Sequence, residues 1–278
     1  MSDDNNSSRN LIRDAKRIVI KVGTSTITYE NGRMNLRNMD RLARAISDLM
    51  NQGREVILVT SGAIGVGIGC LDLDHKPSLM REKQAVASVG QCELMNVYSR
   101  CFAEYSHAVG QILLTKDDLD DNHTRSNINN TMEALLEMGI LPVVNENDTV
   151  STAEILYNGT FGDNDTLSAH VACLMKADLL IILSDIDGFY EDNPKTNPDA
   201  KRIPIVRCID PEMLSHAGGN GSHLGTGGML TKLTAMSLIV SNGIAGVIAE
   251  GSQSQILEEI LEGHDIGTFF DPTCEVRI

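Results

Sequence analysis

The chain has 278 residues, 42% of them hydrophobic, and a formal net charge of −15 at pH 7. This length permits one large α/β domain with a sizeable core. No apolar run approaches the ~20 residues that span a bilayer, and the 23 Lys and Arg residues form no clustered basic face, so we expect neither membrane nor nucleic-acid binding. Residues 1–16 lack the apolar core of a signal peptide and are predicted to form a flexible polar tail. The six cysteines contain no CxxC pair, which favours reduced thiols and a cytoplasmic location.

Short apolar runs that end in polar signatures recur along the chain. In order they are RIVIKVGTST (17–26), EVILVTSGAIG (55–65), VGQILLTKDD (109–118), LPVVNEND (141–148) and LLIILSDIDG (179–188). They lack polar alternation, as expected of parallel strands that are covered on both faces. GIAGVIAEG (243–251) predicts a later strand.

Helical periods lie between these runs. One helix is predicted to end near Gly53, a plausible C′ glycine, and its apolar stripe consists of Leu36, Met39, Leu42, Ile46 and Leu49. Further helices are predicted over residues 81–107, 124–138, 165–175 and 252–263. The alternation of strands and helices predicts the fold class as α/β, a three-layer αβα sandwich with a central, mainly parallel sheet.

The carboxyl ends of the predicted strands carry polar residues at one edge of the sheet. Ligands bind outside the carboxyl ends in such sheets, and this rule brings together Lys21, Ser61, Asp148 and Asp185. A single polar residue at a strand end means little, because every strand must turn somewhere. Several together indicate a binding site.

Lys21 ends an otherwise apolar strand. An unpaired buried ammonium group costs several kcal/mol, so Lys21 needs an anion. That anion is either a carboxylate such as Asp165 or a bound phosphate. With Lys232 as a second lysine at this edge, we expect a phosphate site in which one carboxylate holds both lysines.

Two glycine-rich segments lead into helices. GTGGMLTK (225–232) offers backbone N–H groups, a helix start and Lys232, which together outline a phosphate site; a glycine-rich surface loop is the competing interpretation. VTSGAIGVGIG (59–69) suits an oxyanion cradle built from Ser61 and the N–H groups after it, although close helix–strand packing competes from Gly65 onward. Neither segment matches GxxxxGK[ST] or GxGxxG.

The segment from Val143 to His170 carries five carboxylates, Glu146, Asp148, Glu154, Asp163 and Asp165. Asp165 is predicted to be a helix N-cap, with Asp163 near the positive end of the same helix. Glu154 belongs to a hairpin-like stretch and is expected in water. Asp148 is the better candidate for ligand recognition. No His or Cys accompanies the acids at metal-ligand spacing, so any metal is expected to be a hard ion held mostly by phosphate and water.

Six motifs resemble the glutamate 5-kinase branch of the amino acid kinase family. In chain order they are IVIKVGTS, VTSGAIG, VVNENDTV, FGDNDTLSA, SDIDGFYEDNP and GTGGMLTK, spread over residues 18–232. The resemblance implies transfer of the γ-phosphoryl group of ATP to the side-chain carboxylate of L-glutamate, the first step of proline biosynthesis. It also implies Mg²⁺, a homo-oligomer (dimer or tetramer) and feedback inhibition by L-proline. Many bacterial members continue into an RNA-modification-type domain; for this chain we expect one kinase domain over 17–278, with an amino-acid part (about 17–170) and a nucleotide part (about 171–278).

The resemblance also assigns roles to single residues. The catalytic group is Lys21, Lys232 and Asp165, with Asp165 orienting the two lysines. Glutamate is expected to bind Ser61, Gly62, Asp148 and Asn164. The nucleotide is expected to bind Lys21, Ser184, Asp185, Thr226, Gly227, Gly228, Met229, Leu230, Thr231 and Lys232. No metal ligand from the protein is assigned, because Mg²⁺ is expected to bind mainly through the phosphates of ATP.

Three alternatives remain open at this point. A family member that acts on acetylglutamate, aspartate, carbamate or UMP shares the glycine loops. A nicotinamide-dependent oxidoreductase uses the same sheet edge, but both dinucleotide fingerprints lose their third glycine. A catalytically inactive regulatory protein of this fold is expected to have lost a lysine or the DND aspartates, and all of these are present.

Overall fold

The structure is a computed structural model that describes residues 9–151, 164–192, 194, 196–211, 213–214, 228–252 and 255–276. Its strands are β1 (Arg17–Val22), β2 (Glu55–Val59), β3 (Val109–Leu114), β4 (Leu141–Glu146), β5 (Leu179–Ser184), β6 (Ile205–Ile209), β7 (Ala245–Glu250) and β8 (Thr268–Val276). The labelled helices are α2 (Thr24–Ile27), α3 (Leu36–Asn51), α4 (Ala63–Cys70), α5 (Met80–Ala103), α6 (Lys116–Asp120), α7 (Asn122–Glu137), α9 (Asn164–Leu174), α11 (Met229–Val240) and α12 (Ile256–Leu261).

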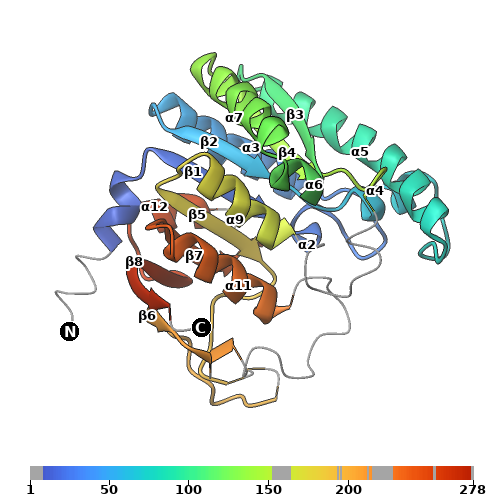
Figure 1. Ribbon diagram of the computed structural model, residues 1–278. Coiled ribbons are helices and arrows are strands. Elements are labelled where there is room, and N and C mark those ends of the chain that lie inside the picture. Colours follow the sequence, from blue (N-terminus) through green and yellow to red (C-terminus); the bar gives the residue numbers. More distant parts are fainter. Residues whose placement is uncertain are drawn as a thin grey trace.

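The strands form one eight-stranded sheet in the order β3-β4-β2-β1-β5-β7-β8-β6 (Figure 1). Each of β3, β4, β2, β1, β5 and β7 runs parallel to its neighbours in this series, whereas β8 runs antiparallel to β7 and parallel to β6. The register places Lys21 of β1 between Val59 of β2 and Ile182 of β5. The carboxyl ends of β4, β2, β1 and β5 therefore lie side by side, as the sequence predicts.

Two buried apolar clusters cover the two faces of the sheet. Side chains of α3, α5 and α12 fill one cluster, where Ile46, Tyr98 and Ile260 are fully buried. Side chains of α7, α9 and α11 fill the other, where Met132, Val171 and Met236 are fully buried. Figure 1 shows these helices on both sides of the strands. The predicted α/β fold, a mainly parallel sheet between two helical layers, is confirmed.

Local sequence signals account for several helix ends. Asn35 accepts a hydrogen bond from the Asn38 N–H at the start of α3, and Thr115 with Asp118 forms a capping box at the start of α6. Gly53 follows the C-cap of α3 with φ of +83°, which confirms it as the C′ residue.

Two sequence expectations about the fold need correction, and two strands are additional. Residues 9–14 are helical rather than part of a flexible tail: Ile12 is fully buried, and the Arg9 guanidinium donates to the Ile266 and Pro204 carbonyl oxygens at 3.3 and 3.2 Å. Leu36, predicted to belong to the apolar stripe of α3, is the first residue of the helix and is 59% exposed, and the buried positions begin at Met39. The strands β6 and β8 were not predicted.

Close packing of α4 against α5 requires glycine at two positions. A Cβ atom at Gly90 would lie 1.8 Å from the Ala63 carbonyl oxygen, and one at Gly67 would lie 2.1 Å from the Val86 carbonyl oxygen. Close helix–strand packing was the competing interpretation of the sequence from Gly65 onward. In the structure Gly67 serves contact between two helices instead, and this contact fixes α4 directly after Ser61 and Gly62.

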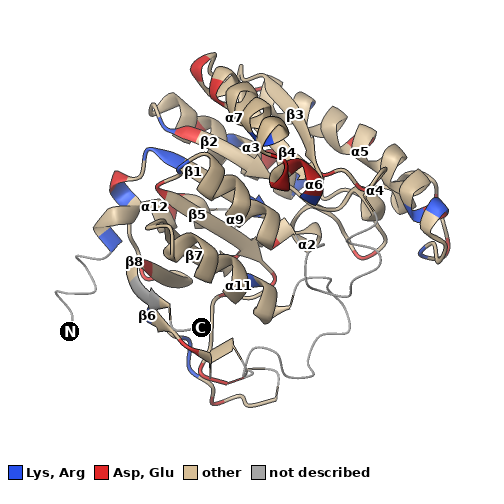
Figure 2. Cartoon of the chain, viewed as in Figure 1, with Lys and Arg blue, Asp and Glu red and all other residues tan. Residues whose placement is uncertain are grey.

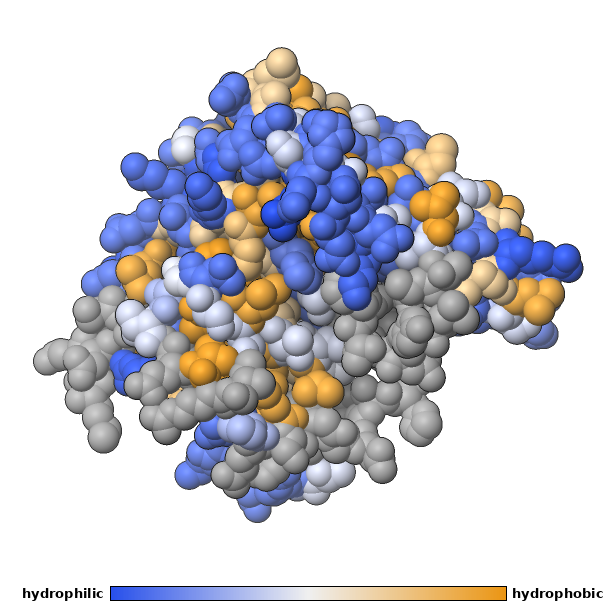
Figure 3. Space-filling model, in the orientation of Figure 1, coloured by the Kyte–Doolittle hydropathy of each residue, from blue (hydrophilic) through white to orange (hydrophobic). Residues whose placement is uncertain are grey.

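The surface is mixed in charge and hydropathy. Figure 2 shows acidic residues gathered on α6, and Figure 3 shows apolar side chains in small groups among hydrophilic ones on the face in view. Within the described part of the chain, no helix is long and apolar enough to cross a membrane.

Candidate functional site

A buried carboxylate lies between two lysines at the carboxyl edge of the sheet. Asp165, in the first turn of α9, is 0% exposed. The Lys21 ammonium nitrogen lies 2.6 Å from its Oδ1, and the Lys232 ammonium nitrogen lies 3.0 Å from its Oδ2. The Thr231 hydroxyl lies 3.3 Å from the same Oδ2. The sequence predicts this arrangement, in which one carboxylate holds both lysines.

The electrostatics of the cluster keep Asp165 ionised. Burial raises its pKa, but the combined attraction and hydrogen bonds of Lys21 and Lys232 outweigh burial and lower the pKa below its ordinary value. The cluster contains two cations and one anion, so it retains one net positive charge. A buried, positively charged cluster is suited to binding phosphate oxygens.

The start of α11 adds backbone donors to this cluster. Gly228 is the N-cap of α11, and Met229 and Leu230 form its first turn ahead of Thr231 and Lys232. The N–H groups at a helix start lack partners within the helix and favour anions. In Figure 1 the starts of α9 and α11 lie on the same side of the molecule, near α2. Of the predicted nucleotide residues, Thr226 and Gly227 lie outside the described residues.

The predicted glutamate residues lie at the ends of neighbouring elements. Ser61 and Asp148 are both 8% exposed and follow β2 and β4, respectively. Asn164 opens α9 beside Asp165; it is 5% exposed, and its Oδ1 has no hydrogen-bond partner among the described residues. Gly62 is the N-cap of α4 with φ of +94°, in the left-handed region that favours glycine. Ser61 and Asp148 thus follow strand ends at the same sheet edge as Lys21, and Asn164 directly precedes Asp165 in α9.

The carboxylates of the segment from Val143 to His170 have different surroundings in the structure. Asp165 is not the N-cap of α9, because the helix already includes Asn164; Asp165 lies in the first turn and points to the lysines instead. Glu146 is 8% exposed and accepts a hydrogen bond from the Ser151 hydroxyl at 2.8 Å, a contact that closes the turn after β4. Glu154 and Asp163 lie outside the described residues, so the roles predicted for them stay predictions.

Ser184 and Asp185 lie at the end of β5, next to the strand that carries Lys21. The Ser184 hydroxyl donates to Asp185 Oδ1 at 3.0 Å, and Asp185 is exposed. The position agrees with the predicted nucleotide side of the edge. The catalytic and binding roles themselves stay predictions.

Sequence reasoning missed two buried polar contacts beneath this edge. The Asn145 amide Nδ2 donates to Gln91 Oε1 at 2.8 Å, and the hydroxyls of Thr60 and Tyr98 lie 2.8 Å apart. Asn145 is in β4, Thr60 follows β2, and both partners are on α5. The only available signal was the polar Asn145 within a strand otherwise buried on both faces.

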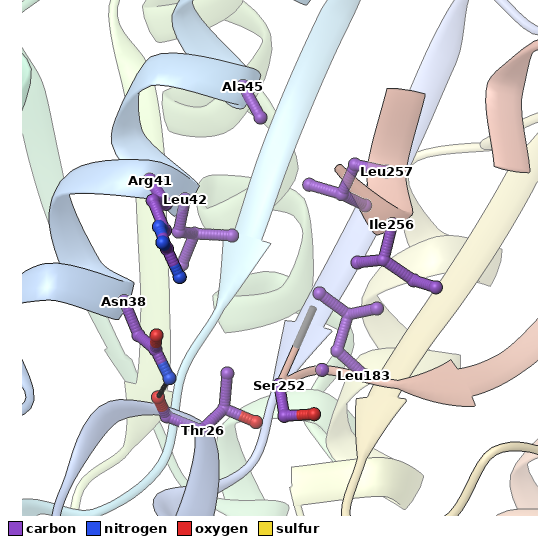
Figure 4. A pocket seen from close by; sticks show the side chains of 10 residues that line it. Thr26, Asn38, Arg41, Leu42, Ala45, Leu183, Ser252, Ile256 and Leu257 are labelled. Carbon is purple, nitrogen blue, oxygen red and sulfur yellow. Dashed lines mark hydrogen bonds between the residues drawn. The ribbon is translucent and has the colours of Figure 1, made fainter. Parts of the chain in front are cut away.

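Two hollows in the described structure are lined by residues other than Lys21, Asp165 and Lys232. A cavity of about 30 Å³ between α3 and α12 has room for little more than water (Figure 4). A larger hollow of about 330 Å³ is lined by Leu119, Arg125, His170, Cys173 and Leu174, none of which is a predicted site residue. No group of three or more His, Cys, Asp or Glu side chains among the described residues is arranged to hold a metal ion.

Comparison with known proteins supports the assignment. Residues 16–250 match the model of the amino acid kinase family. Glutamate 5-kinase of Clostridium perfringens is 56% identical over 262 residues, which cover 94% of this chain and 97% of that protein. Glutamate 5-kinases of Listeria monocytogenes and Enterococcus faecalis are 53% and 52% identical over the same share of this chain, covering 95% and 97% of those proteins.

Solved structures agree on the fold. UMP kinase from Bacillus anthracis aligns with a TM-score of 0.61 at 15% identity, over 93% of this chain and 96% of that one. UMP kinase from Ureaplasma parvum aligns with a TM-score of 0.59 at 15% identity, over 92% of this chain and 98% of that one. At this identity the likeness concerns the fold alone. The family match and the relatives confirm the resemblance carried by the six motifs, and the chain belongs to the amino acid kinase family.

Proposed function

We propose that the protein transfers the γ-phosphoryl group of ATP to the side-chain carboxylate of L-glutamate and forms L-glutamyl 5-phosphate, the first step of proline biosynthesis. The observation that carries the proposal is the cluster of Lys21, Asp165 and Lys232 at the sheet edge that also carries Ser61 and Asp148. The glutamate 5-kinases that match nearly the whole chain at 51–56% identity support this acceptor over acetylglutamate, aspartate, carbamate or UMP.

The chemistry suits a site without a general base. The side-chain carboxylate of glutamate has an ordinary pKa of ~4.3 and is already a nucleophile at neutral pH. The remaining task is to align two anions and to offset charge on the transferring group. Lys21, Lys232 and the N–H groups at the start of α11 supply that charge, and Asp165 holds the lysines in place.

The glutamate half of the site is assigned to the ends of β2 and β4 and the start of α9. Asp148 and the Asn164 amide oxygen bind the ammonium group of glutamate, while the Ser61 hydroxyl and the N–H groups near Gly62 bind its carboxylates. The Asn164 Oδ1 has no hydrogen-bond partner among the described residues and can accept from the ammonium group, which supports this role because buried polar atoms seldom lack a partner unless a ligand supplies one. Residues 17–170 then form the amino-acid part and 171–278 the nucleotide part.

We assign ATP to Ser184, Asp185 and the segment from Gly228 to Lys232, because β5 pairs with the strand that carries Lys21 and α11 carries Lys232. Bound Mg²⁺ supplies further positive charge to the phosphates. We assign Mg²⁺ mainly to the phosphates of ATP, because this ion keeps several waters and usually binds through one or two carboxylates plus substrate phosphates. The proposal also includes a homo-oligomer, inhibition by L-proline and a cytoplasmic location, as in the family expectation.

An assay of ADP release across candidate acceptors tests the proposal. Purified protein with ATP and Mg²⁺ is offered L-glutamate, acetylglutamate, aspartate, carbamate and UMP in parallel. We expect ADP release that depends on L-glutamate and exceeds the release with every other acceptor by at least tenfold in kcat/KM. A preference for another acceptor contradicts the assigned substrate, and no acceptor-dependent ADP contradicts kinase activity.

A further inference from the structure

The helix α5 is joined to the strand ends beneath the candidate site by two buried polar contacts. Gln91 accepts from Asn145 of β4 at 2.8 Å, and two turns further along α5 Tyr98 pairs with Thr60 at 2.8 Å. Gln91 is 7% exposed, and Asn145 and Thr60 are 1% and 0% exposed. The remaining buried side chains of α5 are mainly apolar and fill the core. These polar contacts therefore stand out from ordinary helix packing.

Asn145 lies near the end of β4, the strand that leads to Asp148. This strand pairs with β2, which leads to Ser61. Val144, the neighbour of Asn145, accepts a hydrogen bond from the Thr60 N–H at 2.9 Å, so Asn145 lies beside the end of β2 and the Ser61 that follows it. Asp148 comes three residues after Asn145. The turn that carries Asp148 begins two residues after Asn145 and is closed by a backbone hydrogen bond from the Ser151 N–H to the Asn147 carbonyl oxygen at 2.9 Å.

The amide pair is incompletely satisfied. Gln91 Nε2 and Asn145 Oδ1 are both buried and have no hydrogen-bond partner among the described residues. Leaving a buried donor and acceptor unpaired is costly, and two apolar side chains of the same shape would avoid that cost. A pair that served only to dock α5 onto the sheet has no need of these extra polar atoms.

We propose that Gln91 is a positioning residue for the acceptor: by holding the Asn145 amide, it sets the end of β4 and with it the place of Asp148. This inference rests on the proposed function, since it concerns the binding of L-glutamate. Gln91 acts through Asn145 and makes no contact with the phosphate-binding lysines in the described structure. The binding of glutamate therefore depends on Gln91, and the binding of ATP does not.

The test separates the two substrates. Gln91→Met keeps the length of the side chain and removes the acceptor, so we expect the KM for L-glutamate to rise about tenfold, with the KM for ATP and kcat within threefold of the parent. Gln91→Glu keeps an oxygen that accepts from Asn145 Nδ2 and is expected to recover most of the loss. Arg17→Met removes contacts to Glu55 and Glu133 at the opposite edge of the sheet. It should lower the melting temperature without changing either KM.

A second variant keeps the inference testable if Gln91→Met does not fold. Asn145→Leu removes the other half of the pair and must raise the same KM; the double variant must be no worse than Asn145→Leu alone, because residues that act through one contact are not additive. An unchanged KM for glutamate, or equal increases in both KM values, overturns the inference. If the parent protein does not use glutamate at all, the proposed function fails instead, and the two failures are distinguishable.

Discussion

The ammonium groups of Lys21 and Lys232 contact different oxygens of one carboxylate, that of Asp165, at 2.6 and 3.0 Å. The two lysines come from β1 and α11, which are far apart in the sequence, and the aspartate comes from α9. A single fully buried side chain thus ties three elements together at the edge where the phosphates are expected. This relationship has consequences for both stability and catalysis.

Asp165→Asn is expected to destabilise the fold by about 3–5 kcal/mol at pH 7, because it leaves two buried lysines without their carboxylate. The folded-state pKa of Asp165 is lowered, so its stabilising contribution is present above the unfolded-state pKa of ~3.9 and is lost as the pH falls toward the folded value. Urea unfolding of both proteins at pH 7, 5, 3.5 and 2.5 measures this. The gap between them should shrink below about pH 4; a gap independent of pH contradicts the ionised cluster.

Lys232→Ala is expected to lower kcat by at least about 100-fold while leaving glutamate binding nearly intact, because the lysine offsets charge on the transferring phosphoryl group. Steady-state kinetics with each substrate varied in turn give kcat and both KM values. Lys16→Ala, at an exposed lysine, is the matched control and should behave as the parent. Normal turnover in Lys232→Ala would remove this lysine from the mechanism.

Asp148→Asn is expected mainly to raise the KM for L-glutamate, since the change removes the charge assigned to the ammonium group and retains the shape. An effect of about 10-fold or more corresponds to loss of a charge-assisted hydrogen bond. Asp120→Asn, at an exposed position on α6, is the control. Collapse of kcat at unchanged KM would mean that Asp148 does not read the acceptor.

Gly62→Ala and Gly53→Ala separate backbone strain from a local effect on the site. Both glycines have positive φ, +94° and +83°. Each alanine should therefore cost about 1 kcal/mol in thermal or urea unfolding. A Cβ at Gly62 also lies 3.2 Å from Ile27 Cδ1, whereas one at Gly53 meets nothing within 4 Å. Only Gly62→Ala should reduce kcat/KM for glutamate, and equal activities would contradict a close approach of the acceptor to Gly62.

The polar residues at the carboxyl ends of the strands could be predicted from the sequence, because the patterns that reveal them are local. Lys21, Ser61 and Asp148 each follow an apolar run, and the carboxyl ends of parallel strands must meet at one edge. The partner of Lys21 was also predictable, since a buried ammonium group requires an anion and Asp165 lies in the first turn of a neighbouring helix. These inferences needed only chain order and the cost of burying charge.

The missed features depend on contacts between distant parts of the chain. β6 has the sequence IVRCI with Arg207 exposed, and β8 contains Pro272, so neither shows the continuous apolar pattern of the parallel strands. Gln91 lies 54 residues from Asn145. Nothing in the helical period around Gln91 indicates which strand its amide meets, because that depends on how α5 packs against α4 through Gly67 and Gly90.

Trapping of the product tests the central claim most directly. The protein is incubated with L-glutamate, ATP, Mg²⁺ and hydroxylamine, which converts an acyl phosphate to a hydroxamate. We predict the side-chain hydroxamate of glutamate, identified by mass spectrometry and formed with ADP in equal amounts, and its loss in Lys232→Ala. Release of ADP without hydroxamate, or a hydroxamate on the α-carboxylate, would contradict the account.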